Sequence, residues 1–358
     1  MGSGLSIVVP TYNRADLLLR LLSSPALLGH SRDVLSEVLV VLVGRSDGRS
    51  RLLRELRVPY RLRVLEQVHG SAANARNHGW QAARGRLVLF LDDDVLPDLQ
   101  LIDEHVATHA LHPGALVVGR LLPDAAQRPT PWHDYEDSMR AKTYAREDLI
   151  RHPLGLRYAG NFSISRRRLE EVGGFDPQLA GNQEIDLGYR LAARGVPFLF
   201  NPAAVASHLE VQDYAGWRQA RVLEGRFDLA MYRDQEYAGG LSALASQFRR
   251  RHRLTRVAVG AALRHRASEG ALLASARALG VLGHRFGSRS LSRAAFSVLA
   301  NILYWGGVRD GLRGRRAFSS LMRSEESASG HPRSSSRDIP LRAAKRIASV
   351  RLRSSSLR

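Results

Sequence analysis

Three consecutive carboxylates, Asp92, Asp93 and Asp94, are the residues whose type and spacing most directly suggest chemistry in this chain. They follow the apolar run 87–91 (LVLFL), which predicts a buried strand. Adjacent like charges repel one another unless a cation or hydrogen bonds compensate them. Hard divalent cations such as Mg²⁺ and Mn²⁺ bind carboxylate and phosphate oxygens and bridge the two. The run therefore indicates a metal-dependent site for a diphosphate, with an acidic helix N-terminus as the alternative.

Two later segments carry side chains that could complete such a site. Glu184 and Asp186 open an amphipathic stretch, where a carboxylate either caps a helix or acts as a general base on a substrate hydroxyl. His208 follows a strand-like run and is either a structural histidine or a metal ligand. The chain contains no cysteine, so any metal must be held by oxygen or imidazole ligands.

The apolar pattern predicts the elements that must position these side chains. Short buried strands are expected at 5–10, 38–43, 62–65 and 87–91. Helical stretches alternate with them, around 49–57 and 71–84. This alternation indicates an α/β fold with a mostly parallel sheet flanked by helices, in which ligands bind beyond the carboxyl ends of the strands. The acidic run falls at such an end.

The rest of the chain predicts a mixed region followed by a helical one. Further strands are expected at 117–121 and 198–200, and further helices at 166–172 and 185–194. After about residue 212 the pattern becomes helical, with breaks near Gly239–Gly240 and Gly287. From about Arg313 onward the chain is rich in Ser and Arg and poor in apolar residues, which predicts no fixed fold.

The formal charge of +19, nearly all of it from arginine, lies mostly in the C-terminal third. Such an excess is typical of proteins that bind nucleic acid, an anionic membrane surface or anionic sugar carriers, and coding bias could also produce it. The sequence does not favour nucleic acid, because it contains no paired zinc ligands, RNP-like strand or KH-type GxxG loop. It shows no secretory signal and no apolar run of the roughly 18 residues that a membrane span needs, so a cytoplasmic protein is expected.

Six stretches resemble the inverting family-2 glycosyltransferases with the GT-A fold, a Rossmann-like nucleotide-diphospho-sugar transferase fold, over roughly residues 5 to 230. They occur in the family's order: SIVVPTYNR at 6–14, GSAANARNHGWQAARG at 70–85, VLFLDDDVLP at 88–97, NFSISRRRLEEVGGFDPQL at 161–179, EIDLGYRLAARG at 184–195, and then His208. The resemblance implies a catalytic domain over 1–230. It leaves 231–312 as a helical C-terminal extension and 313–358 as a basic tail.

The resemblance also implies a role for each matching residue. Asp94 and His208 would hold Mg²⁺ or Mn²⁺, and the turn 173–176 would shape the donor-sugar and acceptor pocket. Glu184 stands where the family places its catalytic carboxylate, with Asp186 as the fallback, and the implied reaction inverts the anomeric centre. Binding of the nucleotide-sugar donor is implied for a larger set: Pro10, Thr11, Tyr12, Arg14, Arg76, Asn77, Asp92 and Asp93.

One departure from the family concerns the end of the second strand. The family commonly carries an Asp-Asp pair there, which helps to read the nucleobase, often uracil, whereas this chain has Leu42 and Val43. The loss argues against UDP and leaves open a guanine or thymine nucleotide, or recognition by Asp47. It also leaves open a catalytically silent GT-A-like protein that binds a nucleotide or a glycan.

Two apolar segments, 271–283 and 294–308, are too short to span a bilayer. As helices they could pack on the catalytic domain, form a homo-oligomer, or lie in a membrane interface with Tyr304 and Trp305 at its boundary. Membrane contact would place the protein at the inner face of the cell membrane, and the acceptor would be a glycan, a lipid-linked molecule or another hydroxyl. The chain lacks the QxxRW signature of the processive synthases, so non-processive transfer in polysaccharide or glycoconjugate biosynthesis is implied.

Overall fold

The protein forms two compact units in a computed structural model that describes residues 2–30, 34–44, 53, 55–126, 129–146, 160–209, 212–234, 240–312 and 314–323. The first unit comprises 1–127 and 143–210, and the second comprises 128–142 and 211–358. The predicted domain end at residue 230 lies within helix α10 (Tyr214–Asp234), inside the second unit.

The described part of the first unit is built around an eight-stranded sheet of order β3-β2-β1-β4-β7-β6-β8-β5. Its strands are β1 (Gly2–Thr11), β2 (Leu35–Val43), β3 (Leu62–Gln67), β4 (Gly85–Leu91), β5 (Val95–Pro97), β6 (Leu116–Pro123), β7 (Asn161–Ser165) and β8 (Phe198–His208). Strands β1 to β4 are parallel, β7 runs antiparallel between β4 and β6, and β5 pairs antiparallel with β8. This mostly parallel, mixed sheet confirms the predicted α/β fold class.

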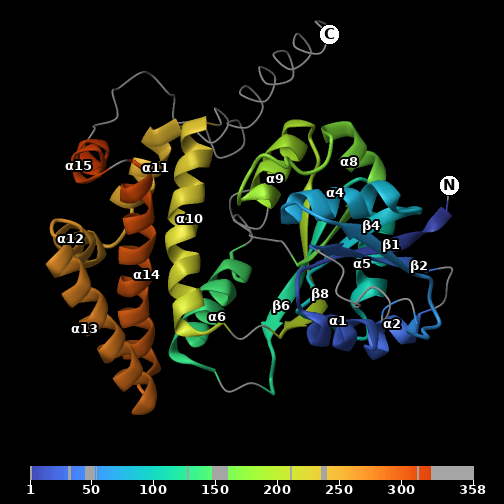
Figure 1. The fold of residues 1–358 in the computed structure, drawn as a ribbon, viewed down its shortest axis with the longest axis horizontal. Helices are drawn as coiled ribbons and strands as arrows, with labels where there is room; N and C mark the ends of the chain where they lie inside the picture. Colours follow the sequence, from blue (N-terminus) through green and yellow to red (C-terminus); the bar gives the residue numbers. More distant parts are fainter. Residues whose placement is uncertain are drawn as a thin grey trace, which may run out of the picture. The chain divides into compact units, whose positions relative to one another are not determined.

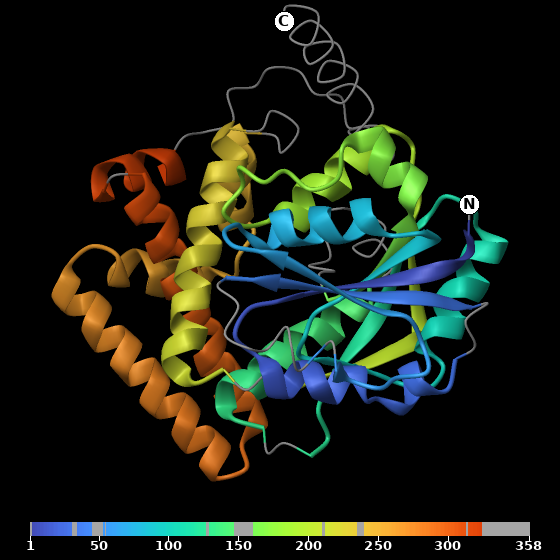
Figure 2. The same ribbon diagram turned by 45° about the vertical axis from the view of Figure 1, so that its right-hand side comes forward.

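Successive residues of the central strands point to opposite faces of the sheet, so each strand contributes to two separate cores. Val8 and Val41 pack on the face covered by α4, α8 and α9, whereas Ile7, Val9 and Val40 pack on the face covered by α1, α2 and α5. Figure 2 shows the helices on both faces of the sheet. These helices are α1 (Ala15–Leu22), α2 (Pro25–Leu28), α4 (Ala72–Ala82), α5 (Leu101–Leu111), α8 (Arg166–Val172) and α9 (Gln183–Ala193).

The second unit is helical, and α14 lies at its centre with α10 on one side and α13 on the other (Figure 1). Helices α10 and α14 approach closely at two glycines. A Cβ at Gly225 would collide with the carbonyl oxygen of Tyr304, and one at Gly307 would collide with that of Val222. In addition to α10, the unit contains α6 (Pro131–Tyr144, of which the residues up to 142 belong to this unit), α11 (Gly240–Arg249), α12 (Arg253–Ala262), α13 (Arg266–Arg285), α14 (Arg289–Gly311) and α15 (Arg315–Arg323).

Two expectations for the C-terminal part were wrong. Residues 315–323 form the helix α15 rather than an unfolded tail, because Phe318 is buried in ring contact with Trp305 and Phe248. Trp305 is fully buried and Tyr304 donates a hydrogen bond to Asp228, so neither residue lies at a membrane boundary. Within the described residues, no helix combines the length and the apolarity that crossing a bilayer requires.

Candidate active site

The loop after β1 meets the acidic run that follows β4. The two strands are adjacent and parallel, so their carboxyl ends lie at the same edge of the sheet. The hydroxyl of Thr11 donates to Asp93 Oδ2 at 2.6 Å. Arg14 Nη1 donates to Asp94 Oδ2 at 2.6 Å and lies 3.4 Å from Asp93 Oδ1. Burial raises the pKa of Asp93, against the opposing effects of the Thr11 hydrogen bond and the Arg14 charge.

Asp92 is held from the opposite side by a residue of α4. Arg76 Nη2 donates to Asp92 Oδ1 at 2.9 Å, and the buried guanidinium lies 5.7 Å from the centroid of the Phe175 ring. A capping box between Ser71 and Asn74 fixes the start of α4 one turn before Arg76. The Nε of Arg76 is buried and has no hydrogen-bond partner within the described part of the chain. This donor is therefore left unsatisfied by the described residues.

Asp94 and His208 are brought together by the pairing of β5 with β8. Val95 lies opposite His208 in this ladder, and the backbone N–H of Leu209 donates to the carbonyl oxygen of Asp94 at 2.7 Å. His208 Nε2 lies 3.6 Å from Asp94 Oδ1. Two ligands that each lie about 2.1 Å from one ion are roughly 3 to 4 Å apart, so this pair fits a shared divalent cation.

No group of three His, Asp or Glu side chains converges as a metal site among the residues that the structure describes. A cation at Asp94 and His208 would therefore depend on other oxygen ligands. Mg²⁺ is commonly bound in this way, through one or two carboxylates together with substrate phosphates and water. The donor set fits a metal that arrives with a diphosphate.

The turn 173–176 is held against α4 by Asn77. The side-chain amide of Asn77 donates to the carbonyl oxygen of Phe175 at 2.7 Å and accepts from its N–H at 2.9 Å. Gly174 has φ of +69°, and a Cβ there would lie 2.5 Å from Asn77 Oδ1, so the turn requires glycine. The sequence assigns Asn77 to the nucleotide, whereas these contacts give it a positioning role for Phe175 and thereby for Arg76.

Helix α9 carries the two candidate bases in different surroundings. Asp186 is buried, and its Oδ2 accepts from Arg190 Nε at 2.9 Å and Nη2 at 2.6 Å. Arg190 also donates to the carbonyl oxygen of Val172, which joins α9 to α8. Glu184, in the first turn, is partly exposed. The ion pair makes Asp186 part of the scaffold and leaves Glu184 as the accessible carboxylate.

The end of β2 differs from the polar edge around the acidic run. Leu42 packs into the core on one face of the sheet and Val43 into the core on the other, so the strand continues where the family carries its Asp pair. Tyr12 is 63% exposed, and its ring lies beside Gly44, whose φ is +103°. Pro10 precedes this loop within β1, and Asp47 lies outside the described residues.

Gly160 and Asn161 belong to the site's support, and the sequence analysis assigned neither a role. Gly160 has φ of +99°, and a Cβ there would lie 3.0 Å from Asp92 Oδ2. Asn161 is buried and donates to the carbonyl oxygen of Ala204 at 3.0 Å, while its Oδ1 lies 2.9 Å from His105 Nε2. The available signal was the stretch 161–179, whose first residue fixes β7 beside β4.

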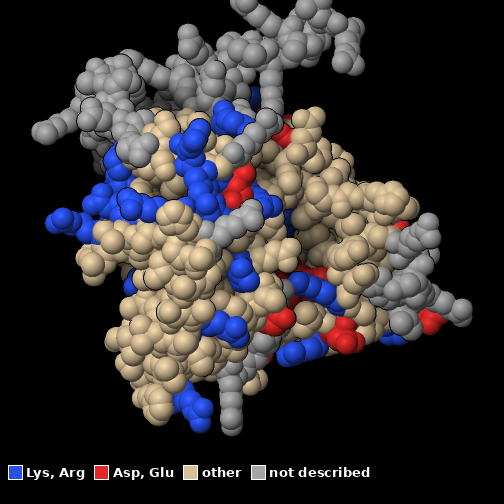
Figure 3. Space-filling model, turned by 60° about the vertical axis from the view of Figure 1, so that its left-hand side comes forward, with Lys and Arg blue, Asp and Glu red and all other residues tan. Residues whose placement is uncertain are grey.

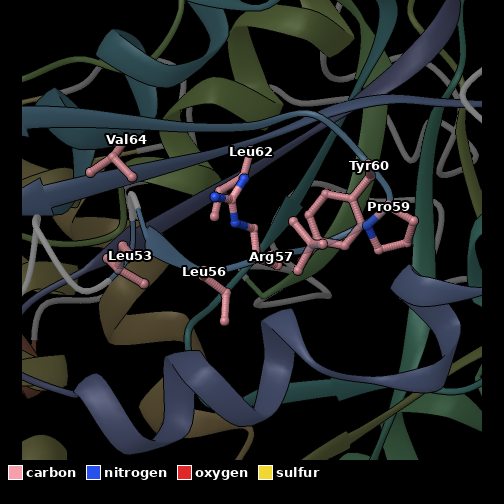
Figure 4. Close-up of a pocket in the computed structure, with 8 residues that line it drawn as sticks. Leu53, Leu56, Arg57, Pro59, Tyr60, Leu62 and Val64 are labelled. Carbon is pink, nitrogen blue, oxygen red and sulfur yellow. The ribbon is translucent and has the colours of Figure 1, made fainter.

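A separate cavity of about 500 Å³ lies beside the edge strand β3 (Figure 4). The residues that line it are apolar apart from Arg57 and Tyr60. The Tyr60 hydroxyl donates to the carbonyl oxygen of Leu22 at 2.6 Å. None of the predicted site residues lines it. The candidate active site is therefore separate from this cavity.

The comparisons with known proteins identify the family. Residues 3–226 match the family model described as Glycosyltransferase like family 2. Validoxylamine A glucosyltransferase from Streptomyces hygroscopicus subsp. jinggangensis is 31% identical over 228 residues, which are 54% of this chain and 52% of that protein. Chondroitin synthase from Escherichia coli is 25% identical over 246 residues, which are 58% of this chain and 35% of that protein. The chain thus spans about half the length of the first relative and less of the second.

Among solved structures, the mannosyltransferase PcManGT from Pyrobaculum calidifontis, in complex with GDP-Man and Mn²⁺, aligns with a TM-score of 0.54. The alignment covers 83% of this chain and 85% of that one at 20% sequence identity. At this identity the likeness shows that the two chains share a fold.

Proposed function

The chain belongs to glycosyltransferase family 2, with the GT-A fold, and on that premise we propose that it transfers a sugar from a nucleoside-diphosphate donor to an acceptor hydroxyl with inversion. One observation carries the proposal. Side chains from the β1 loop, from α4 and from β8 converge on the three carboxylates that follow β4. A structural acidic cap would not need partners from three separate elements.

The donor is held by the residues that already contact the acidic run. Tyr12 offers an exposed aromatic face on which a nucleobase can stack. Arg14 and Arg76 supply guanidinium donors for phosphate oxygens, and Arg76 Nε is the group with a donor to spare. Asp92 accepts from the ribose or sugar hydroxyls, and Asp93 holds the β1 loop through Thr11.

Asp94 and His208 would hold Mg²⁺ or Mn²⁺, which when bound would supply positive charge for the departing diphosphate. The mannosyltransferase of the same fold was solved with Mn²⁺, which supports a metal at this position. Arg14, which contacts Asp94, places a second positive charge at the same edge and limits repulsion within the acidic run when no ion is bound.

Glu184 acts as the general base. It removes the proton from the acceptor hydroxyl while the hydroxyl oxygen attacks the anomeric carbon from the face opposite the diphosphate. The new bond forms from the acceptor oxygen to the sugar as the bond from the sugar to the diphosphate breaks, so the anomeric configuration inverts. Asp186 keeps α9 in place through Arg190 and is not the base.

The donor nucleotide is proposed to be other than UDP. Leu42 and Val43 present no carboxylate for the imide N–H of uracil at the end of β2, because both side chains pack into the cores. A GDP-sugar is the first candidate, in line with the GDP-Man of the structural neighbour, followed by a dTDP-sugar or recognition through Asp47. The acceptor is proposed to be a glycan or lipid-linked hydroxyl, glycosylated non-processively in the cytoplasm during polysaccharide or glycoconjugate synthesis.

The test is release of nucleoside diphosphate from a panel of UDP-, GDP-, dTDP- and CDP-sugars with Mn²⁺, Mg²⁺ or EDTA. We expect slow hydrolysis of one donor that EDTA and Asp94→Ala both abolish, because each removes the cation at the diphosphate. Asp98→Ala, which alters an exposed carboxylate four residues further on, is the matched control and should hydrolyse the donor normally.

Donor binding, followed by thermal shift, separates the two functional classes. Metal-dependent binding without hydrolysis, even with acceptor mixtures present, would identify a silent binding protein, the alternative that Leu42 and Val43 favour. The absence of both binding and turnover with every donor tested would overturn the proposal.

A further inference from the structure

The second unit carries positive charge that its own carboxylates do not balance. Between residues 240 and 309 the only acidic residue is Glu269. Glu269 is engaged within the unit, because Arg309 Nη1 donates to its Oε2 at 2.7 Å. Of the arginines of this stretch, Arg293 pairs with Asp134 and Arg309 with Glu269. The others are Arg249, Arg250, Arg251, Arg253, Arg256, Arg264, Arg266, Arg277, Arg285 and Arg289.

Helix α12 is apolar on its outer side as well as its inner side. Val259 and Ala262 are buried and face the rest of the unit. On the opposite side, Leu254 is 72% exposed and Val257 is 69% exposed, and Ala261 continues the stripe one turn later. Packing explains the inner side alone, so the outer stripe has no partner within the described unit.

The C-terminal half of α13 repeats this pattern. Leu282 is 50% exposed and Phe286, in the turn toward α14, is 78% exposed. Arg285 and Arg289 are both exposed on either side of this turn. Both α12 and α13 pack on α14 (Figures 1 and 2), and the residues of their outer stripes are exposed.

Figure 3 turns this side of the molecule forward, and its left part shows blue and tan side chains with almost no red. An isolated apolar residue on a surface is ordinary, whereas a stripe of large apolar side chains with arginines at both ends is not. This combination matches a helix that lies in a lipid interface.

We propose that the outer stripes of α12 and α13, with Leu254, Val257, Leu282 and Phe286 as their large apolar residues, bind the surface of an anionic bilayer. The apolar side chains enter the boundary between head groups and acyl chains. The flanking arginines bind the lipid phosphates and keep their guanidinium groups at the head-group level. The inference concerns the second unit and does not depend on the transfer reaction.

A second copy of the chain fits this surface less well. A two-fold dimer would place the same stripe against itself and would bring arginines against arginines, with no carboxylate to compensate them. A soluble polyanion would satisfy the arginines but would leave the apolar side chains in water. A bilayer with anionic head groups satisfies both.

The test is flotation of the full chain with phosphatidylcholine vesicles, with and without phosphatidylglycerol. The wild type should float with the anionic vesicles alone. The triple variant Leu254→Ser, Leu282→Ser, Phe286→Ser should reduce vesicle partitioning at least tenfold, because three inserting side chains are lost. A matched triple, Val68→Ser, Leu99→Ser, Leu111→Ser, removes similarly exposed apolar side chains from the first unit and should float like the wild type.

Three results would overturn the proposal. In the first, the wild type fails to float. In the second, the serine triple variant floats as well as the wild type, whereas a chain ended after Arg323 does not float; this result would assign binding to residues 324–358. Sedimentation could instead show that the wild type dimerises without lipid and that the triple variant does not, which would assign the surface to a second copy. Circular dichroism and thermal melting of each variant should match the wild type, since all the substituted side chains are exposed.

Discussion

At the scale of single residues, three adjacent carboxylates occupy three different environments. Asp92 pairs with an arginine of α4, Asp93 with a threonine hydroxyl, and Asp94 with Arg14 and His208. The partners come from three parts of the chain, because Thr11 and Arg14 both belong to the loop after β1. Asp94 is therefore the carboxylate with an imidazole beside it, which is why we propose it as the metal ligand.

The two carboxylates of α9 should respond differently to loss of charge. Glu184→Gln should lower the transfer rate by about 10³-fold with little change in donor affinity, because a general base typically contributes 10²- to 10⁴-fold. Asp186→Asn should instead lower the free energy of unfolding by about 3 kcal/mol, because it leaves the charge of Arg190 buried without its partner. Turnover kinetics, donor titration and urea denaturation of both variants separate the two roles.

Equal turnover by the wild type and Glu184→Gln would refute the base assignment. Loss of turnover in Asp186→Asn at unchanged stability would transfer that role to Asp186.

The residues at the strand ends and their partners Thr11, Arg14 and Arg76 could be named from the sequence motifs, whereas the pairing between them could not. An acidic run after an apolar strand indicates a site wherever it occurs, because strand ends face ligands in such sheets. The ion pair between Asp186 and Arg190 depends on which side of α9 is buried, and the pattern allowed either carboxylate to face outward. Asn77 shows the same limit. Its motif indicates a site residue, but it does not indicate that the side-chain amide bonds to the backbone of Phe175, 98 residues further along the chain.

At the scale of elements, α5 and β7 are joined by a buried polar network. His105 and His109 both lie within hydrogen-bonding distance of the Ser163 hydroxyl, at 2.7 and 2.8 Å. Burial is the main cause that lowers the pKa of each histidine to about 4. Because β7 lies between β4 and β6, the network supports the strand beside the acidic run.

These histidines predict an acid-sensitive stability. Above about pH 6.5 both are neutral whether the chain is folded or not, so their hydrogen bonds contribute fully. Between about pH 6.5 and 4 the unfolded chain takes up protons that the folded chain does not, and the free energy of unfolding falls by about 2 kcal/mol per histidine at pH 5. Urea titrations at pH 7 and pH 5 measure the difference.

A matched pair of variants assigns this pH dependence. His109→Gln can keep a hydrogen bond to Ser163 without titrating, so it should lose about half of the difference between pH 7 and pH 5. His112→Gln, which alters an exposed histidine one turn on, should keep all of it. An unchanged difference in His109→Gln would show that other groups control the acid response.

The crossing of α10 and α14 gives a second prediction at this scale. Gly307→Ala should destabilise the protein by about 2 kcal/mol or more, because its methyl group meets the carbonyl oxygen of Val222. Gly306→Ala should instead be neutral or stabilising by up to about 1 kcal/mol, because its nearest contact would be 3.5 Å away and alanine is the better helix former. The melting temperature should fall for Gly307→Ala and stay the same or rise for Gly306→Ala. A fall of the melting temperature in both variants would contradict the close crossing.

At the scale of the whole molecule, the two units differ in how well the sequence predicts them. The strands of the first unit follow from short apolar runs whose length and β-branched residues favour buried strands. In the second unit α13 and α14 have similarly apolar sequences, yet α14 is buried and α13 is exposed along its outer side. Composition could not decide between them, because the choice depends on which helix the others surround.

The contribution of α6 to the second unit was also beyond the sequence pattern. Residues 128–142 leave the first unit and supply Trp132 and Tyr135 to a cluster with Trp217, Phe296 and Leu299. No local signal marks a segment whose apolar partners lie about 80 to 160 residues further along the chain. The predicted end of the catalytic domain at residue 230 consequently keeps α6 but removes Phe296.

This crossover sets an order of events during synthesis. The segment that carries Trp132 and Tyr135 leaves the ribosome long before α14, which completes its core, so the nascent chain exposes these aromatic side chains until α14 has been synthesised. The first unit is completed in the meantime, because its residues 143–210 follow the excursion and precede α14. We therefore expect protection by chaperones to be needed most during this interval. An expression fragment that ends before α14 would keep Trp132 and Tyr135 exposed.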